Sequence, residues 1–88
     1  MPRYIIEREI GTLTRDEIEA ASRRSLEVAE SMPGVVWIRS YVSDTEGKIY
    51  CEYDAPNEDA VREHARRAGL PVDRISMVSL ELSPTMFR

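Results

Sequence analysis

The chain has very little of the side-chain chemistry that usually marks a catalytic or metal site. Its 88 residues include one cysteine, Cys51, and one histidine, His64. A single cysteine excludes an internal disulfide, so nothing indicates an oxidising compartment and we expect a cytoplasmic protein. The usual phosphate-loop, dinucleotide, zinc-protease, dithiol and serine-elbow motifs are all missing. The sequence therefore does not support hydrolysis or phosphoryl transfer.

Long apolar runs and concentrated basic surfaces are also missing. No segment approaches the roughly 20 apolar residues that span a bilayer, and the N-terminal residues lack the organisation of a signal peptide. The net charge is −4, with arginines and glutamates interspersed along the chain. Binding to phosphate backbones needs a concentrated basic surface. We therefore expect neither nucleic acid nor a membrane as a partner.

The patterns that are present predict one small domain over residues 1–88. Residues 3–10 are rich in isoleucine and predict a strand. Thr14 and Glu17 then form a T-x-x-E capping box, and the apolar residues that follow recur at spacings of three and four. This spacing predicts an amphipathic helix that ends at the Pro33-Gly34 pair.

The second half of the chain repeats the alternation of strand and helix signals. Residues 35–43 and 48–53 are β-branched and aromatic, and the short turn between them predicts a hairpin. Asn57 is a suitable N-cap for a helix running to about Ala68, before Gly69, and residues 75–83 predict a last strand.

The resulting order, β-α-β-β-α-β, is that of the ferredoxin-like α+β fold. Right-handed crossovers give an antiparallel four-stranded sheet with both helices on one face. The first and third strands are expected at the centre of the sheet, and the second and fourth at its edges. One face of the sheet is left without a covering helix.

The alternation of side chains along the strands predicts what that uncovered face carries. With the aliphatic rows placed beneath the helices, the other rows combine large aromatic side chains with carboxylates. A monomer would not be expected to expose such a patch, so we expect a homodimer that packs sheets face to face or joins edges. The residues expected on the open face are Ile5, Glu7, Glu9, Trp37, Arg39, Tyr41, Tyr50, Glu52, Met77, Ser79 and Glu81.

A dimer of this kind could enclose a ligand cleft between the two sheets. An alternative interpretation is that the aromatic side chains serve only the dimer interface. The residues predicted to line the cleft are Glu7, Glu9, Trp37, Arg39, Tyr41, Tyr50 and Glu52.

Cys51 and His64 are the candidates for a metal or thiolate site. Both are predicted to point toward the covered side of the sheet, so the two side chains could approach each other. The alternative is that Cys51 packs as a small apolar residue and His64 is hydrogen-bonded in the core. Two ligands also fall short of the three or four that zinc or nickel takes from protein.

The carboxylates of the open face are a second metal candidate. Glu7, Glu9, Glu52 and Glu81 could hold a divalent ion that bridges two subunits. Alternatively, Arg8 and Arg39 pair with some of these carboxylates and leave ordinary surface ion pairs.

Three stretches of the chain carry a resemblance to a known family. They are "MPRYIIERE", "VVWIRSYVSDTEGKIYCEYDAPNEDAVREHARRAGLPVDRI" and the valine-containing last strand. Together they resemble a small bacterial family of unknown function, nickel-binding-protein-like, over nearly the whole chain. The resemblance implies a ferredoxin-like subunit that dimerises and binds Ni²⁺ or another divalent metal. No organic cofactor is evident.

The first functional hypothesis is therefore a small dimeric protein that binds a divalent metal, nickel, for sequestration or sensing. An alternative is a small-ligand-binding or oxygenase-like dimeric α/β-barrel protein with a cleft on the open sheet face. A third is a protein–protein module without its own chemistry. Fold alone does not choose between these hypotheses, but the poverty of catalytic motifs favours a binding protein over an enzyme.

Overall fold

Strand β1 (Arg3–Glu9) lies inside the sheet and is paired along both edges. The computed structural model describes all 88 residues and orders the sheet β2-β3-β1-β4, with every neighbouring pair antiparallel. β3 (Lys48–Asp54) and β4 (Arg74–Met77) flank β1, while β2 (Val36–Ser43) pairs with the outer edge of β3. The predicted ferredoxin-like order, with the first and third strands central, is confirmed.

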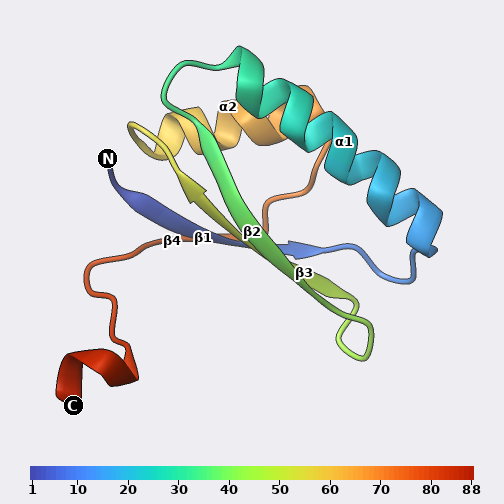
Figure 1. Ribbon diagram of the computed structural model, residues 1–88. Helices are drawn as coiled ribbons and strands as arrows, with labels where there is room; N and C mark the ends of the chain where they lie inside the picture. The colour runs from blue at the N-terminus through green and yellow to red at the C-terminus, as the bar shows by residue number, and fades with distance from the viewer.

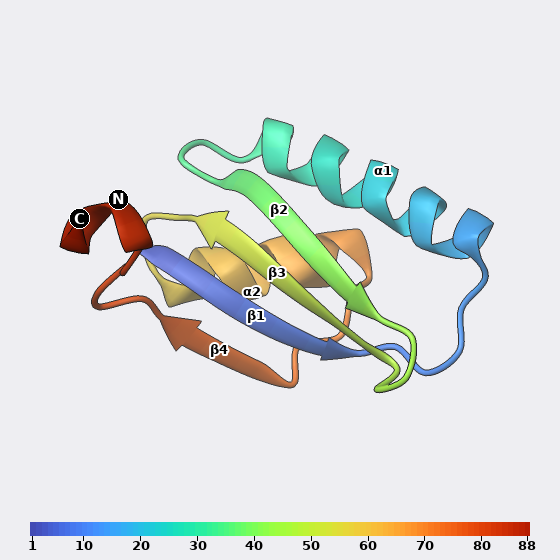
Figure 2. The same ribbon diagram turned by 60° about the horizontal axis from the view of Figure 1, so that its bottom comes forward.

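Both helices lie on the same face of the sheet. Helix α1 (Arg15–Ser31) follows β1 and helix α2 (Glu58–Ala68) follows β3, and Figure 1 shows them side by side above the strands, while Figure 2 shows α2 behind the strands. Neither helix has the length and apolar character needed to cross a membrane. The opposite face of the sheet has no helical cover, as the sequence predicts.

The predicted helix ends are confirmed in detail. At the start of α1, the Thr14 hydroxyl accepts a hydrogen bond from the Glu17 amide at 3.1 Å, and the Glu17 carboxylate accepts one from the Thr14 amide at 2.9 Å. The Asn57 side chain caps α2 by accepting from the Ala60 amide at 2.8 Å. Gly69 ends α2 with φ +69°, a left-handed conformation that favours glycine.

A small core fills the space between the helices and the sheet. Its apolar members come from β1, β3, α2, the end of α1 and the loops beside them, and most are small or aromatic. Arg8, Ser25 and His64 are buried with them. The apolar cluster consists of Tyr4, Ile6, Ala29, Val35, Cys51, Tyr53, Ala55 and Val61.

A β-bulge in β2 overturns part of the predicted facing. Trp37 pairs with Tyr53, and Arg39 pairs with the next residue of β3, Glu52, so Ile38 is an extra residue in the ladder. An extra residue reverses the alternation of the strand that contains it. The prediction that Trp37 lies on the open face is therefore wrong, because its side chain packs against the core.

The same bulge accounts for the facing at the start of β2. Val35 is buried in the core, whereas Val36 is about half exposed. Trp37 is held on the covered side by a hydrogen bond of 2.9 Å from its indole N–H to the Ser40 hydroxyl. Beyond the bulge, Arg39 and Tyr41 take the predicted open-face positions.

Strand β4 is shorter than predicted. It ends at Met77, which pairs with Tyr4, and the Val78 amide makes the last contact with β1 at the Arg3 carbonyl. Beyond this contact the chain makes no further backbone hydrogen bond to β1. Ser79 and Glu81 therefore lie outside the sheet, and Met77 is on the covered side of it. All three were expected on the open face, and each expectation is wrong.

Residues 78–88 leave the sheet as an extended segment, here called the C-terminal arm. It ends in a short 3-10 helix, η1 (Pro84–Phe87), which lies away from the two-layer body in Figures 1 and 2. The large apolar side chains of the arm are exposed: Leu80 by 71%, Leu82 by 64%, Met86 by 58% and Phe87 by 75%.

The capping box of α1 gives a direct test of local stability. We expect Thr14→Ala to lower the free energy of unfolding by about 1 kcal/mol, because alanine has no hydroxyl to accept the hydrogen bond from the Glu17 amide. Urea unfolding followed by circular dichroism measures the change. Thr12→Ala is the matched control, since Thr12 is exposed and makes no side-chain hydrogen bond. Equal losses in the two variants would contradict the assignment.

Candidate functional site

The open face of the sheet presents two rows of side chains that cross all four strands. Residues paired across antiparallel strands point to the same side, so the strand register defines each row. Glu7, Arg39, Tyr41, Tyr50 and Glu52 take their predicted positions on this face, and Glu9 follows opposite Lys48. The first row is Ser76, Ile5, Glu52 and Arg39, and the second is Arg74, Glu7, Tyr50 and Tyr41.

The carboxylates of this face have basic neighbours, but the ion pairs are longer than hydrogen bonds. Glu7 lies 3.7 Å from the Lys48 ammonium and 3.7 Å from the Arg74 Nε, and Glu52 lies 3.9 Å from the Arg39 Nε. Pairs that are partly exposed and this far apart contribute little to stability. Glu7 and Glu52 are therefore available to other cations at small energetic cost.

Glu81 belongs to a different arrangement, at the root of the C-terminal arm. Arg3 Nη1 donates to the Glu81 carboxylate at 2.7 Å, while Arg3 Nε and Nη2 donate to the two Asp54 oxygens at 2.9 and 3.3 Å. These hydrogen bonds from Arg3 hold the pKa of Asp54 below its usual range. Glu81 serves here to tie the arm to β1.

No group of three or more histidine, cysteine, aspartate or glutamate side chains in the chain is placed to hold a metal ion. The four carboxylates predicted as a cluster are spread along β1, β3 and the arm, and three of them have basic neighbours. One chain by itself therefore lacks the three or more protein ligands that a nickel or zinc site takes.

Cys51 and His64 both lie on the covered side of the sheet, as their spacing predicts. Cys51 is 5% exposed and His64 is 1% exposed. The hydrogen bonds of His64 go to Ser25, whose carbonyl oxygen is 3.0 Å from Nε2, and not to Cys51. The structure thus brings the two residues into one core without joining them in a hydrogen-bonded pair.

His64 is held in a buried polar cluster with Ser25 and Tyr53. Because Nε2 donates to the Ser25 carbonyl, Nδ1 carries the lone pair, and it has no partner. The ring centroids of His64 and Tyr53 are 4.8 Å apart, and the Tyr53 hydroxyl is 2.6 Å from the Ser25 hydroxyl. Burial lowers the pKa of His64 and raises that of Tyr53, since both effects disfavour the charged form.

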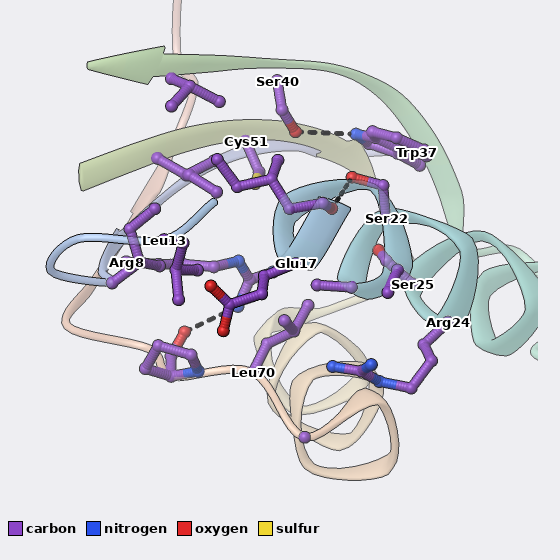
Figure 3. A pocket seen from close by; sticks show the side chains of 18 of the residues that line it. Arg8, Leu13, Glu17, Ser22, Arg24, Ser25, Trp37, Ser40, Cys51 and Leu70 are labelled. Carbon is purple, nitrogen blue, oxygen red and sulfur yellow. Dashed lines mark hydrogen bonds between the residues drawn. The ribbon is translucent and has the colours of Figure 1, made fainter. Parts of the chain in front are cut away.

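A cavity of about 480 Å³ lies beneath α1, on the covered side of the sheet (Figure 3). Its walls come from α1, the start of the loop after β1, the covered rows of β2 and β3, and the loop after α2. Trp37 and Cys51 line this cavity, so two of the predicted site residues share a hollow; Cys51 lies on its predicted side of the sheet and Trp37 on the opposite side from its predicted one.

Arg8 is the cavity residue that sequence reasoning missed. It is 1% exposed, and its Nη1 donates to the Pro71 carbonyl at 2.8 Å. The interpretation that Arg8 pairs with carboxylates of the open face is wrong, because β1 turns Arg8 to the covered side with Tyr4 and Ile6. The sequence does carry a signal for this position. If Tyr4 and Ile6 face the core, strict alternation along the strand places Arg8 in the same buried row.

The depressed pKa of His64 predicts a dependence of stability on pH. Below about pH 6.5 His64 binds a proton in the unfolded chain but stays neutral in the native chain. The free energy of unfolding should therefore fall, as the pH is lowered, by up to about 1.4 kcal/mol per pH unit. Urea unfolding from about pH 7.5 to about pH 5.5 measures this slope, above the range where free carboxylates titrate. His64→Gln should flatten it, and an unchanged slope in that variant would refute the assignment.

No curated protein matches the chain. A solved structure and a family model both match it, and they point to the same relative. A crystal structure of SCO4226 from Streptomyces coelicolor A3(2) matches with a TM-score of 0.81 and 26% identity, covering 91% of this chain and 99% of that one. The family model described as "Nickel responsive protein SCO4226-like" matches residues 4–78. The chain therefore belongs to the nickel responsive protein SCO4226-like family.

Proposed function

We propose that this protein binds Ni²⁺ as a homodimer, with the metal ligands drawn from two copies of the open sheet face. The family match over residues 4–78 is the observation that carries the nickel part of the proposal. Sequestration or sensing of the ion is the role that such binding would serve. The family description relates its members to nickel, and the identity of the metal and its ligands in this chain are our inference.

The chemistry of the open face supports a shared site. Glu7 and Glu52 are only loosely paired with Lys48, Arg74 and Arg39, at distances between 3.7 and 3.9 Å. A two-fold axis through this face would bring two copies of each carboxylate together. Two copies could thus supply the three or more ligands that one chain lacks. Tyr41 and Tyr50 would lose their exposure in the same contact.

The C-terminal arm supports a second copy as the partner. Four of its side chains, Leu80, Leu82, Met86 and Phe87, are more than half exposed, and no element of the same chain covers them. Large apolar side chains left exposed along one segment usually mark an interaction site. A domain of 88 residues also has a small core, and dimerisation adds buried apolar area that the single chain cannot supply.

The nickel proposal is tested by calorimetric titration of the tag-free protein with Ni²⁺. We expect the double variant Glu7→Gln/Glu52→Gln to weaken binding by at least about tenfold, since removing even an outer-shell partner of a metal commonly costs that much. Glu27→Gln/Glu30→Gln is the matched control, because both residues are exposed on α1 and the net charge changes equally.

Three outcomes of that titration would contradict the proposal. Wild-type protein without saturable Ni²⁺ binding would remove the nickel function. Equal affinity in the open-face and control variants would remove the ligand assignment. If Cys51→Ala or His64→Ala abolished binding while the open-face variant did not, the metal would belong to the buried pair instead.

The dimer is tested separately by light scattering coupled to size-exclusion chromatography. We expect wild-type protein to elute with the mass of two chains and Leu80→Asp/Leu82→Asp to elute with the mass of one. The physical reason is that a buried carboxylate without a partner is too costly to keep at an apolar interface. Leu26→Asp is the control, because Leu26 is exposed on α1, away from the arm. A monomeric wild type, or a dimeric arm variant, would refute this interface.

A further inference from the structure

The cavity beneath α1 has the size and walls of a small-molecule site. Its volume of about 480 Å³ falls within the roughly 300–1,000 Å³ of ligand pockets. The walls are mainly apolar, and the one buried charged group among them is the guanidinium of Arg8 (Figure 3). The apolar side chains that matter here are Ile10, Leu13, Ile18, Ala21, Val42 and Ile49.

Arg8 has an unused edge for hydrogen bonding. Its Nη1 is engaged with the Pro71 carbonyl, but Nε and Nη2 are buried and have no partner. These two nitrogens form the side of the guanidinium that binds both oxygens of a carboxylate. A buried cation without hydrogen bonds or a counter-ion is energetically costly, so a carboxylate at this edge would relieve a real penalty.

The chain itself shows what that edge binds when a carboxylate is present. Arg3 uses Nε and Nη2 to hold the two oxygens of Asp54, and Arg66 uses the same two atoms to hold those of Glu63. In both cases the planar fork of the guanidinium matches the planar carboxylate. In Arg8, a third arginine, the fold fixes the same Nε–Nη2 edge, but no carboxylate of the chain binds there.

The charged side chains around the cavity do not fill that role. Its lining includes Glu9, Glu17 and Arg24 besides Arg8, and neither carboxylate accepts a hydrogen bond from Nε or Nη2 of Arg8. Glu17 is exposed and already accepts the Thr14 amide in the capping box. Glu9 is exposed at the end of β1, opposite Lys48. The chain therefore supplies no negative charge at this edge of Arg8, and an anion from outside the chain can supply it.

We propose that the cavity beneath α1 binds an aliphatic carboxylic acid, with its carboxylate on the Nε–Nη2 edge of Arg8 and its hydrocarbon chain along the apolar wall. Because Nε and Nη2 are covered from water, the acid reaches them by displacing neighbouring lining side chains. The site lies on the covered side of the sheet and is separate from the nickel ligands proposed on the open face. It stands whether or not the chain binds nickel.

Sodium octanoate is the probe, with octan-1-ol and octylamine as matched ligands that keep the chain but change the head group. In ¹⁵N-labelled wild-type protein, with a chelator present to exclude metal effects, octanoate should shift the Arg8 Nε–H resonance downfield in a saturable manner. The alcohol and the amine should bind at least about tenfold more weakly, because neither supplies a two-oxygen anion. No saturable shift below the micelle-forming concentration, or equal binding of all three ligands, would overturn the proposal.

Variants separate this site from any other surface that takes up octanoate. Arg8→Met should weaken octanoate binding at least about tenfold and bring it to the level of octan-1-ol, while Arg23→Gln, an exposed arginine of α1 outside the cavity, should leave it unchanged. Ala21→Phe fills the cavity from α1 and should abolish binding while Arg8 is retained. If Arg8→Met does not fold, the Ala21→Phe variant and the wild-type resonance decide the question. Unchanged binding in Ala21→Phe would overturn the proposal.

Discussion

The pairing of β1 with β3 sets the facing of side chains throughout the sheet. β1 is hydrogen-bonded along both edges, so the direction of each of its side chains is set, and the register with β3 transmits that choice to the neighbouring strand. Tyr4, Ile6 and Arg8 turn toward the helices, while Ile5 and Glu7 turn away from them. A shift of one residue would exchange the two sets, placing carboxylates in the core. The division of the molecule into a covered and an open face follows from this register.

Each face carries a different kind of chemistry as a result. The open face gathers loosely paired carboxylates and two tyrosines, which suits cations and a second subunit. The covered face gathers a buried arginine with a free edge and an apolar cavity, which suits an anion with a hydrocarbon body. The buried polar cluster of Ser25, Tyr53 and His64 lies on the covered side and joins α1, β3 and α2 by hydrogen bonds. Family membership relates the protein to nickel, and the chemistry of the open face suits such a cation, whereas that of the covered face suits an organic anion.

Much of the fold could be predicted because its signals are local. The capping box at Thr14, the cap at Asn57 and the turn at Gly69 depend on atoms a few residues apart, and all three are present. The order of strands and helices follows from short-range patterns and the handedness of crossovers. The candidate site was less predictable, because it depends on facing. The bulge at Ile38 inserts one residue into β2 and carries Trp37 to the opposite side from its predicted one. Nothing in the residues around Ile38 distinguishes a bulged strand from a regular one.

Capping, periodicity and strand alternation act between near neighbours, so each segment's own residues set the elements, their order and the balance of side chains on the central strands. The end of β4 and the free edge of Arg8 arise only where distant segments meet. β4 ends at Met77, just before the last backbone contact, which joins Val78 to Arg3 at the other end of the chain. Arg8 keeps an unpaired edge because α1 and the loop after α2 bury it without bringing a carboxylate within reach. Both outcomes depend on contacts between distant segments, and no pattern within either segment encodes them.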